Sequence, residues 1–430
     1  MTRHVARESR AYVRAAAEIL DGKDHLNLVS AMSPQLPTRL IATLLSEARR
    51  REIRVSLYVS DLTARFAFLD DNAEDDLRSG RLRITMLAGG APRALAHLVD
   101  SLPLSLWETD RLLSSGVIPC DVYAVRVARG VRGFELGNAV GFTPTLAAMP
   151  EVRLAAEVAP AGEYVGGLFP TPPEWWADAV TVSDDSAAVS PVATTAAAEP
   201  VRDRIAELVA GLIPGDATLE VGLGGVADAL IGALATRPGI GIHSGILPRA
   251  LREYLVGRSY SAVSKTVDPG LNVATGLAVD AGAAAWPETV RLHPVSVTHD
   301  PFRLAQQHKL WGVNSGFSVD LSGQVNAEWV GGVKVAVGGG QHDFTRAAHQ
   351  SVGGESVIAL PSRSGGGLGR IVKSLARVTP VTTSASDVDF VVTEWGIAEL
   401  GGRSLAERAR ALIAIAHPED RVGLRASADN

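Results

Sequence analysis

The chain has 430 residues, of which 46% are hydrophobic and 20% are charged, and its formal net charge is −6. This composition excludes a disordered chain, and the length predicts two domains rather than one core. The negative charge without a dense Lys or Arg run argues against a nucleic-acid backbone as partner. The single cysteine, Cys120, excludes a disulfide scaffold and fits a reducing, cytoplasmic compartment.

The N-terminal half predicts a helix followed by alternating strands and helices. Met1 to Leu20 alternates Arg and Ala, which predicts an amphipathic helix rather than a signal peptide. No run of about 20 apolar residues predicts a membrane span. Cys120 precedes an apolar run, so we expect a buried structural thiol rather than a reactive one. Strand-like segments at 26–30, 55–59, 82–87, 122–127 and 152–158 alternate with helical stretches such as 37–50.

A Ser-, Ala-, Thr- and Pro-rich stretch at 184–200 has linker composition and predicts domains at 1–183 and 201–430. After it, the pattern predicts a helix from Val201, a strand over 217–223 and a helix over 226–234. Repeated strand–loop–helix units predict an α/β fold in which two open, largely parallel-sheet domains face each other across a cleft. Such a cleft is a common site for small ligands.

The predicted last helix begins at a capping box, in which Ser404 and Glu407 each satisfy a backbone N–H of the first turn. Its buried stripe follows at helical spacing, and we expect the tail after Pro418 to fray. The stripe comprises Ala409, Leu412, Ile413 and Ala416.

Two glycine-rich segments each follow a strand-like run and precede a helix. Gly222-Leu223-Gly224-Gly225 lets backbone N–H groups approach an anion, although the motif alone favours a plain strand-to-helix turn. Gly338-Gly339-Gly340-Gln341-His342-Asp343-Phe344 lies between a strand-like run at 335–337 and a helix expected to begin near Asp343. Three consecutive glycines cost backbone entropy, which favours a very tight turn or a ligand close to the main chain.

Several ordered segments give the C-terminal half a specific resemblance. Asn314 to Val325 reads Asn-Ser-Gly-Phe-Ser-Val-Asp-Leu-Ser-Gly-Gln-Val, and 391–400 reads Val-Val-Thr-Glu-Trp-Gly-Ile-Ala-Glu-Leu. With the second glycine-rich segment, 359–362, 369–372 and 408–418, these segments resemble the acetyl-CoA hydrolase/transferase family of glutamate-dependent CoA-transferases. The match extends from about Val201 to His417, whereas the N-terminal half matches only weakly.

The resemblance implies a two-step covalent mechanism on an acyl-CoA thioester. A glutamate carboxylate attacks the thioester, an acyl-glutamyl anhydride and then a glutamyl-CoA thioester form, and an acceptor carboxylate takes the CoA. By position, Asn314 and a backbone N–H of the Gly339–Gly340 turn polarise the carbonyl, and Glu394 orients the nucleophile or acceptor. Asn314 also suits a plain turn, and Glu394 suits a helix N-terminus. The resemblance assigns coenzyme A binding to Gly222, Gly224, Gly225, Gly338, Gln341, Ser362 and Arg370.

The sequence departs from the family at the nucleophile. The family segment equivalent to 241–246 carries the attacking glutamate where this chain has Gly245, which cannot be acylated. Ser318 replaces a glutamate of many relatives, and His299 replaces an asparagine. His243 and Ser244 adjoin the vacant position, but neighbours on a strand point to opposite faces, so a Ser–His nucleophile pair is disfavoured.

These residues predict an acyl-CoA transferase or hydrolase that acts without the usual glutamyl anhydride. Its partners would be an acyl-CoA and a small acceptor (a carboxylate, water or another nucleophile), with no metal, no membrane and possibly a homodimer. Two alternatives stay open. The first is a non-catalytic CoA-binding homologue or inactive partner subunit, and the second is a conventional transferase whose nucleophile comes from another loop.

Overall fold

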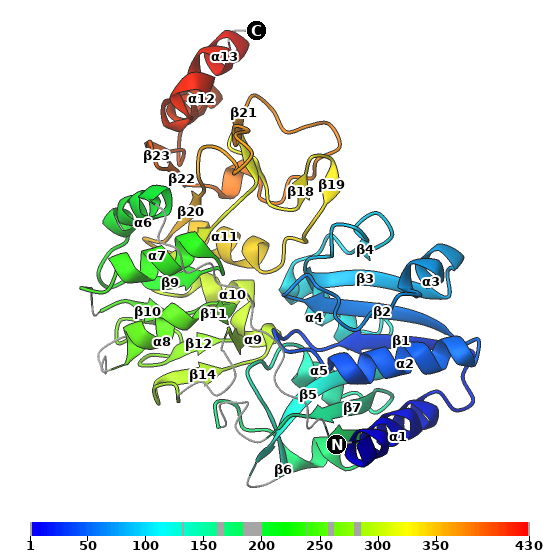
Figure 1. Ribbon diagram of the computed structural model, residues 1–430. Coiled ribbons are helices and arrows are strands. Elements are labelled where there is room, and N and C mark those ends of the chain that lie inside the picture. Colours follow the sequence, from blue (N-terminus) through cyan, green and yellow to red (C-terminus); the bar gives the residue numbers. More distant parts are fainter. Residues whose placement is uncertain are drawn as a thin grey trace. The chain divides into compact units, whose positions relative to one another are not determined.

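The computed structural model describes residues 2–130, 133–160, 167–183, 200–237, 239–256, 262–278 and 285–428 (Figure 1). The chain forms two compact units. The first comprises Met1–Ala193, Thr275–Ala285 and Leu292–Ser296, and the second comprises Thr194–Ala274, Trp286–Arg291 and Val297–Asn430. Residues 184–199 of the predicted linker lie outside the described residues, and Pro200 is the first residue of a helix.

The first unit contains an eight-stranded sheet in the order β4-β3-β2-β1-β5-β7-β8, with β6 paired to β5. Every neighbouring pair along this order is parallel, and only the β5–β6 pair is antiparallel. The strands are β1 (His25–Ser30), β2 (Arg54–Asp61), β3 (Leu82–Gly89), β4 (Asp100–Ser101), β5 (Val122–Gly130), β6 (Gly133–Leu136), β7 (Arg153–Val158), β8 (Val180–Ser183) and the separate β13 (Gly276–Leu277). The helices are α1 (Thr2–Ile19), α2 (Thr38–Arg50), α3 (Ala73–Ser79), α4 (Leu106–Ser114), α5 (Thr143–Ala147) and the 3-10 turn η1 (Pro173–Trp176).

The second unit contains a six-stranded sheet in the order β10-β9-β15-β20-β22-β23. Its pairs are parallel except for the antiparallel β22–β23 edge, which confirms the predicted α/β class with mainly parallel sheets. These strands are β9 (Thr218–Val221), β10 (Gly241–Ile242), β15 (Leu310–Asn314), β20 (Glu355–Ala359), β22 (Phe390–Thr393) and β23 (Gly396–Glu399).

Helices and short strands complete the second unit. The helix α11 packs against β15 and β20, and α6 packs against α7 and β22. The helices are α6 (Pro200–Leu212), α7 (Gly225–Ala233), α8 (Arg249–Leu255), α9 (Val295–Thr298, where the chain passes from the first unit into the second), α10 (Pro301–Ala305), α11 (Gln341–Gln350), η2 (Ala385–Asp387), α12 (Leu405–Ile415) and α13 (Pro418–Ala428). The short strands are β11 (Ile246–Leu247), β12 (Asn272–Ala274), β14 (Val290–Leu292), β16 (Ser318–Asp320), β17 (Val325–Asn326), β18 (Trp329–Val330), β19 (Val333–Lys334) and β21 (Ile371–Val372).

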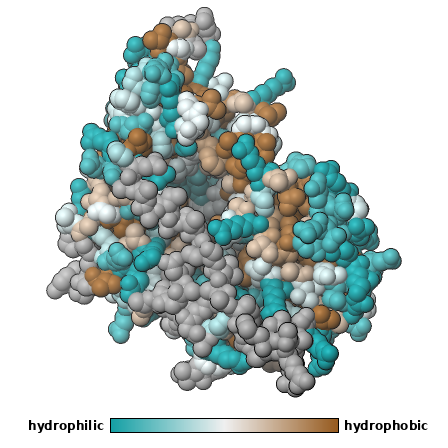
Figure 2. Space-filling model, in the orientation of Figure 1, coloured by the Kyte–Doolittle hydropathy of each residue, from teal (hydrophilic) through white to brown (hydrophobic). Residues whose placement is uncertain are grey.

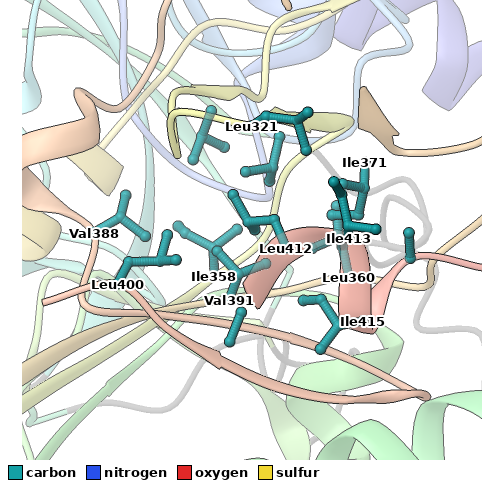
Figure 3. Close-up of a cluster of buried hydrophobic side chains, with 14 of the residues drawn as sticks. Leu321, Ile358, Leu360, Ile371, Val388, Val391, Leu400, Leu412, Ile413 and Ile415 are labelled. Atoms are coloured by element: carbon teal, nitrogen blue, oxygen red, sulfur yellow. The ribbon is translucent and has the colours of Figure 1, made fainter. Parts of the chain in front are cut away.

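The core of the second unit fixes the ends of β20 and β22. Leu412 and Ile413 of α12 pack with Ile358 and Leu360 from the β20 segment and with Val391 of β22 (Figure 3). Each such buried aliphatic side chain contributes about 1.5–3 kcal/mol. The predicted capping box is present at the start of α12, where the Ser404 side chain accepts from the Glu407 N–H and the Glu407 side chain accepts from the Ser404 N–H.

The chain after Pro418 is helical, so the prediction of a frayed tail is wrong. Asp420 of α13 pairs with Arg363 at 2.6 Å, Arg421 Nε donates to the Ala416 carbonyl, and Leu424 is buried. Sequence alone could not predict the Arg363 contact, because that residue lies far away in the chain. The strand expected at 335–337 instead ends at Lys334, since β19 covers only two residues.

The surface has the usual mixture of side chains. On the face shown in Figure 2, hydrophobic residues are interspersed with hydrophilic ones. Among the described residues no helix is long and apolar enough to cross a membrane. Cys120 is half-buried, and burial raises the pKa of its thiol to about 12, which agrees with the structural thiol that the sequence predicts.

Candidate functional site

Five of the sequence-predicted residues of the second unit lie at or just beyond the carboxyl ends of its parallel strands. Because these strands run in the same direction, their carboxyl ends lie at one edge of the sheet, where α/β proteins bind ligands. The positions are Gly222 after β9, Gly245 after β10, Asn314 at the end of β15, Ser362 after β20 and Glu394 after β22.

The two residues before Gly245 are held by the fold. The Ser244 hydroxyl donates to the Val221 carbonyl at 2.8 Å. His243 Nε2 lies 3.1 Å from the Thr298 carbonyl, and Gln307 Nε2 lies 2.8 Å from His243 Nδ1. A carbonyl only accepts, so His243 carries its proton on Nε2 and accepts at Nδ1. These separate partners agree with the expectation that His243 and Ser244 form no nucleophile pair.

Position 245 faces an imidazole and an aromatic ring. A Cβ added to Gly245 would lie 3.4 Å from His299 Nε2 and 3.8 Å from Phe344 Cε2. These are ordinary contact distances, so the backbone leaves room for a side chain there. Two of the three departures from the family pattern, Gly245 and His299, are therefore spatial neighbours.

His299 is fully buried, with an exposed fraction of 0%. Its Nδ1 lies 2.8 Å from the Thr298 hydroxyl, and its ring meets the edge of Phe344 with centroids 4.9 Å apart. Its Nε2 is buried and has no hydrogen-bond partner among the described residues. Burial lowers the pKa of His299 to about 3, so the imidazole is neutral.

The second glycine-rich segment approaches the same imidazole. A Cβ on Gly340 would lie only 2.7 Å from His299 Nε2, so glycine is required there. Gly339 has a φ of +56°, which a side chain would strain, and a Cβ on Gly338 would meet the His342 ring at 2.8 Å. The segment ends at the N-terminus of α11, where the N-cap residue Gly340 has no side chain to hydrogen-bond the backbone N–H groups of the first turn. Gln341 Nε2 donates to the Thr383 hydroxyl at 3.0 Å rather than being held within the turn.

Asn314 is fixed by a carboxyl group that sequence reasoning missed. Asn314 Nδ2 donates to Glu220 Oε2 at 2.8 Å. Glu220 lies on β9 and is 3% exposed, and burial raises its pKa to about 8 while the Asn314 hydrogen bond opposes that rise. Glu220 is therefore protonated at neutral pH. The only available signal was an acidic residue inside the short apolar run of β9.

A second polar cluster lies at the ends of β20 and β22. Glu394 Oε2 accepts from the Ser362 N–H at 2.8 Å, and Glu394 Oε1 accepts from the Ser362 hydroxyl at 2.5 Å. Trp395 Nε1 donates to the same hydroxyl at 3.1 Å. Burial lowers the pKa of Arg370, and the charge of Glu394 opposes that change. The structure thus brings Ser362 and Glu394 together, although the sequence assigned them different roles.

The first glycine-rich segment is open on one side. A Cβ on Gly222 or Gly224 would meet nothing within 4 Å, whereas one on Gly225 would lie 2.8 Å from the Arg202 guanidinium. Gly224 has a φ of +132° and caps α7 without a side-chain hydrogen bond. Ser318, the third departure, lies on β16, where its hydroxyl accepts from Asn326 at 3.3 Å. Within the described ranges no group of three or more His, Cys, Asp or Glu is arranged to hold a metal ion.

The chain is similar to known proteins in sequence and in fold. Residues 285–428 match the family model described as acetyl-CoA hydrolase/transferase C-terminal domain. The 4-hydroxybutyrate coenzyme A transferase of Clostridium kluyveri is 38% identical over 231 residues, which cover 52% of this chain and 53% of that protein. The succinyl-CoA:cyclohexane-1-carboxylate CoA transferase of Geobacter metallireducens is 33% identical over 226 residues, 52% of each chain.

The chain thus spans about half the length of the curated relatives it matches. Similarity of fold extends further than similarity of sequence. The crystal structure of RipA from Yersinia pestis superposes with a TM-score of 0.82, covers 98% of both chains and is 27% identical.

Proposed function

Because the chain belongs to the acetyl-CoA hydrolase/transferase family through its C-terminal domain, we propose that it acts on an acyl-CoA thioester. In this proposal a small acceptor, which is a carboxylate, water or another nucleophile, attacks the thioester carbon directly and the CoA thiolate leaves. With a carboxylate acceptor, the CoA thiolate then attacks the acceptor's carbonyl in the resulting mixed anhydride, so that CoA passes to the acceptor and the original acid is released. No acyl-glutamyl anhydride forms. The activities for which the relatives are named, which are CoA transfers involving carboxylic acids, support the substrate class.

The observation that carries the proposal is the environment of Gly245. The atoms nearest to a Cβ at this position belong to His299 and Phe344, and none of them is a carboxylate oxygen. Glu220 is engaged by Asn314 and has a pKa of about 8, so it is a neutral acid and a poor nucleophile at pH 7. A direct attack by the acceptor therefore fits these residues better than covalent catalysis by glutamate.

The remaining residues supply binding and polarisation. The α11 N-terminus at Gly339 and Gly340 offers backbone N–H groups and a positive helix end to the oxyanion that develops on the thioester carbonyl. Asn314, oriented by Glu220, is the side-chain donor for the same oxygen. Loss of one such donor typically lowers the rate by about 10²–10³. Glu394, held by Ser362, orients the acceptor.

Binding of coenzyme A is assigned to three backbone and side-chain segments. The open Gly222–Gly225 loop lets the main chain approach the ligand, since Gly222 and Gly224 face no other group within 4 Å. Gly338 and Gln341 at the start of α11, Ser362 after β20 and Arg370 before β21 are proposed to contact the rest of the CoA moiety.

The test combines binding, turnover and trapping on the purified chain. Calorimetric titration with acetyl-CoA and longer acyl-CoA esters should show binding. Formation of a new acyl-CoA with a panel of carboxylates, or thiol release with water alone, should show turnover. Borohydride added during turnover should not inactivate the protein, because no glutamyl thioester forms. Inactivation that maps to a glutamate would refute the direct mechanism, and binding without turnover over the whole panel would favour a non-catalytic homologue.

Gly245→Glu provides the matched gain-of-function variant. Its Cβ fits at 3.4 Å from His299, so the backbone leaves room for the start of the side chain. We expect the variant to acquire borohydride sensitivity in the presence of acyl-CoA together with measurable transfer to a carboxylate. Gly245→Gln, which has the same size but cannot form an anhydride, should stay insensitive.

The proposal also covers the cellular compartment and the oligomeric state of the protein. We infer a reducing compartment such as the cytoplasm from the single cysteine, and a homodimer from the family resemblance. Light scattering at micromolar concentration tests the dimer. The reaction as proposed calls for no metal ion, so turnover should be unchanged after treatment with EDTA.

A further inference from the structure

His299 is the buried polar side chain that the proposed function leaves unused. Its Nε2 has no hydrogen-bond partner among the described residues, although the ring is fully buried. A buried polar nitrogen without a partner costs about 1–3 kcal/mol, so a ligand that hydrogen-bonds to it would be stabilised there. The groups around it show what that ligand would be.

Two glycines lie against this buried nitrogen. A Cβ at Gly340 would collide with Nε2 at 2.7 Å, and one at Gly245 would touch it at 3.4 Å. These are also the positions that the family resemblance assigns to the oxyanion turn and to the attacking group. Nε2 therefore lies between the place where the thioester carbonyl is polarised and the place where a nucleophile attacks it.

The ring is held in place by a chain of contacts. Gln307 fixes His243, and His243 donates to the Thr298 carbonyl. The Thr298 hydroxyl lies 2.8 Å from His299 Nδ1, and Phe344 packs against the ring. With Nδ1 engaged by a hydroxyl that can either donate or accept, Nε2 can both take up a proton and return it.

The charges around position 245 favour one acceptor. Its neighbours are a neutral imidazole and an apolar ring, because burial holds the pKa of His299 at about 3. A carboxylate there would be desolvated without a cationic partner, which is costly. A water molecule carries no such penalty and needs only a hydrogen-bond acceptor.

We propose that His299 is the catalytic base of a direct hydrolysis, with water as the acceptor at the position vacated by Gly245. This inference rests on the proposed action on acyl-CoA thioesters. The water oxygen bonds to the thioester carbon while one of its protons passes to Nε2, and the carbonyl becomes an oxyanion facing the α11 N-terminus. Collapse breaks the carbon–sulfur bond, and Nε2 returns the proton to the departing sulfur. The products are a carboxylic acid and free CoA.

The decisive experiment compares His299→Asn with the wild-type chain in steady-state hydrolysis of acyl-CoA without added acceptor. General-base catalysis typically contributes about 10²–10⁴ in rate, so we expect kcat to fall at least 100-fold while the calorimetric Kd for acyl-CoA changes less than about threefold. His349→Asn is the matched control, because His349 is partly exposed and pairs with Asp389 elsewhere. It should keep the wild-type kcat.

A single turnover in ¹⁸O-water should place the label in the acid product. His299→Ala should recover part of its rate when free imidazole is added, an effect that a purely structural histidine would not give. Gly245→Ala, whose methyl group would cover Nε2 at 3.4 Å, should lower kcat about tenfold with an unchanged circular dichroism spectrum. This variant keeps the test decisive if the His299 variants fail to fold.

The outcomes separate the two claims. Wild-type protein that binds no acyl-CoA would refute the proposed function. Wild-type protein that turns over acyl-CoA only with a carboxylate acceptor, or whose hydrolysis survives in both His299→Asn and Gly245→Ala, would overturn the assignment of His299 and leave the proposed function in place.

Discussion

Glu220 makes the stability of the second unit depend on pH in a direction that is unusual for a carboxylate. Burial raises its pKa from 4.5 to about 8, so the folded state holds a proton that the unfolded state has lost. Between these two pH values the folded state binds more protons, and its stability falls as the pH rises. At about 1.36 kcal/mol for each pH unit, the loss by pH 7 is on the order of 3 kcal/mol.

Glu220→Gln should remove this loss. Glutamine has nearly the shape of the protonated acid, and its carbonyl oxygen can accept the Asn314 hydrogen bond that Glu220 Oε2 accepts at 2.8 Å. The variant and the wild-type chain should be almost equally stable near pH 4.5, and the variant should gain stability progressively up to pH 8. The difference between the two proteins cancels the titration of every other group.

Urea unfolding followed by circular dichroism at several pH values between 5 and 8 measures this difference. Glu207→Gln, a change at a solvent-exposed glutamate of α6, is the matched control and should show a difference that does not grow with pH. A Glu220→Gln difference that stays flat across the range would show that the carboxyl is ionised in the folded protein. In that case the assignment of Glu220 as a neutral positioning group for Asn314 would be wrong.

Three further substitutions test the parts of the site. Gly340→Ala places a methyl group 2.7 Å from His299 Nε2. It should lower the free energy of unfolding in urea by about 1–3 kcal/mol and slow thioester turnover. A variant with unchanged stability and turnover would contradict the close packing of the turn. Ser362→Ala removes the hydroxyl that donates to Glu394 at 2.5 Å. It should lower kcat for acyl-CoA turnover about tenfold without changing acyl-CoA binding measured by calorimetry, and equal kcat values would argue against a role for Glu394. Leu412→Ala should cost about 2–5 kcal/mol of unfolding free energy, because Leu412 is fully buried between α12 and the sheet, and a cost below 1 kcal/mol would contradict that packing.

Much of the fold could be predicted from the sequence because local pattern decides it. The strands at β1, β2, β3, β5 and β7 lie where apolar, β-branched runs predicted them, and α2, α6 and α7 begin within a residue of the expected positions. The family-like motifs fixed the α/β class in the same way. The helix α13 was missed because its stability depends on a pairing between Asp420 and the distant Arg363.

The sequence predicted several residues of the candidate site, but it did not predict which of them contact one another. The sequence singled out Gly245, Gly340 and His299 separately, but only the structure shows that both glycines face the same imidazole nitrogen. Their segments come from three different loops, and no local spacing relates them. Glu220 was overlooked because an acidic residue within a strand is usually half-exposed, whereas this one is 3% exposed and bonded to Asn314.

The environment of His299 bears on whether the loss of the family glutamate reflects decay or a change of chemistry. A fold under pressure for stability alone gains nothing from a buried nitrogen with no partner, since covering or replacing it would recover about 1–3 kcal/mol. A glycine at 245 by itself would be compatible with decay. Three features are instead compatible with a position reserved for a reacting molecule. Gly245 and Gly340 both lie against the nitrogen, Gly340 has no room for a larger residue, and the ring is fixed through Thr298 and His243. Strain or unmet hydrogen bonding retained at a strand-end site is the pattern that functional groups produce when they are held ready for substrate.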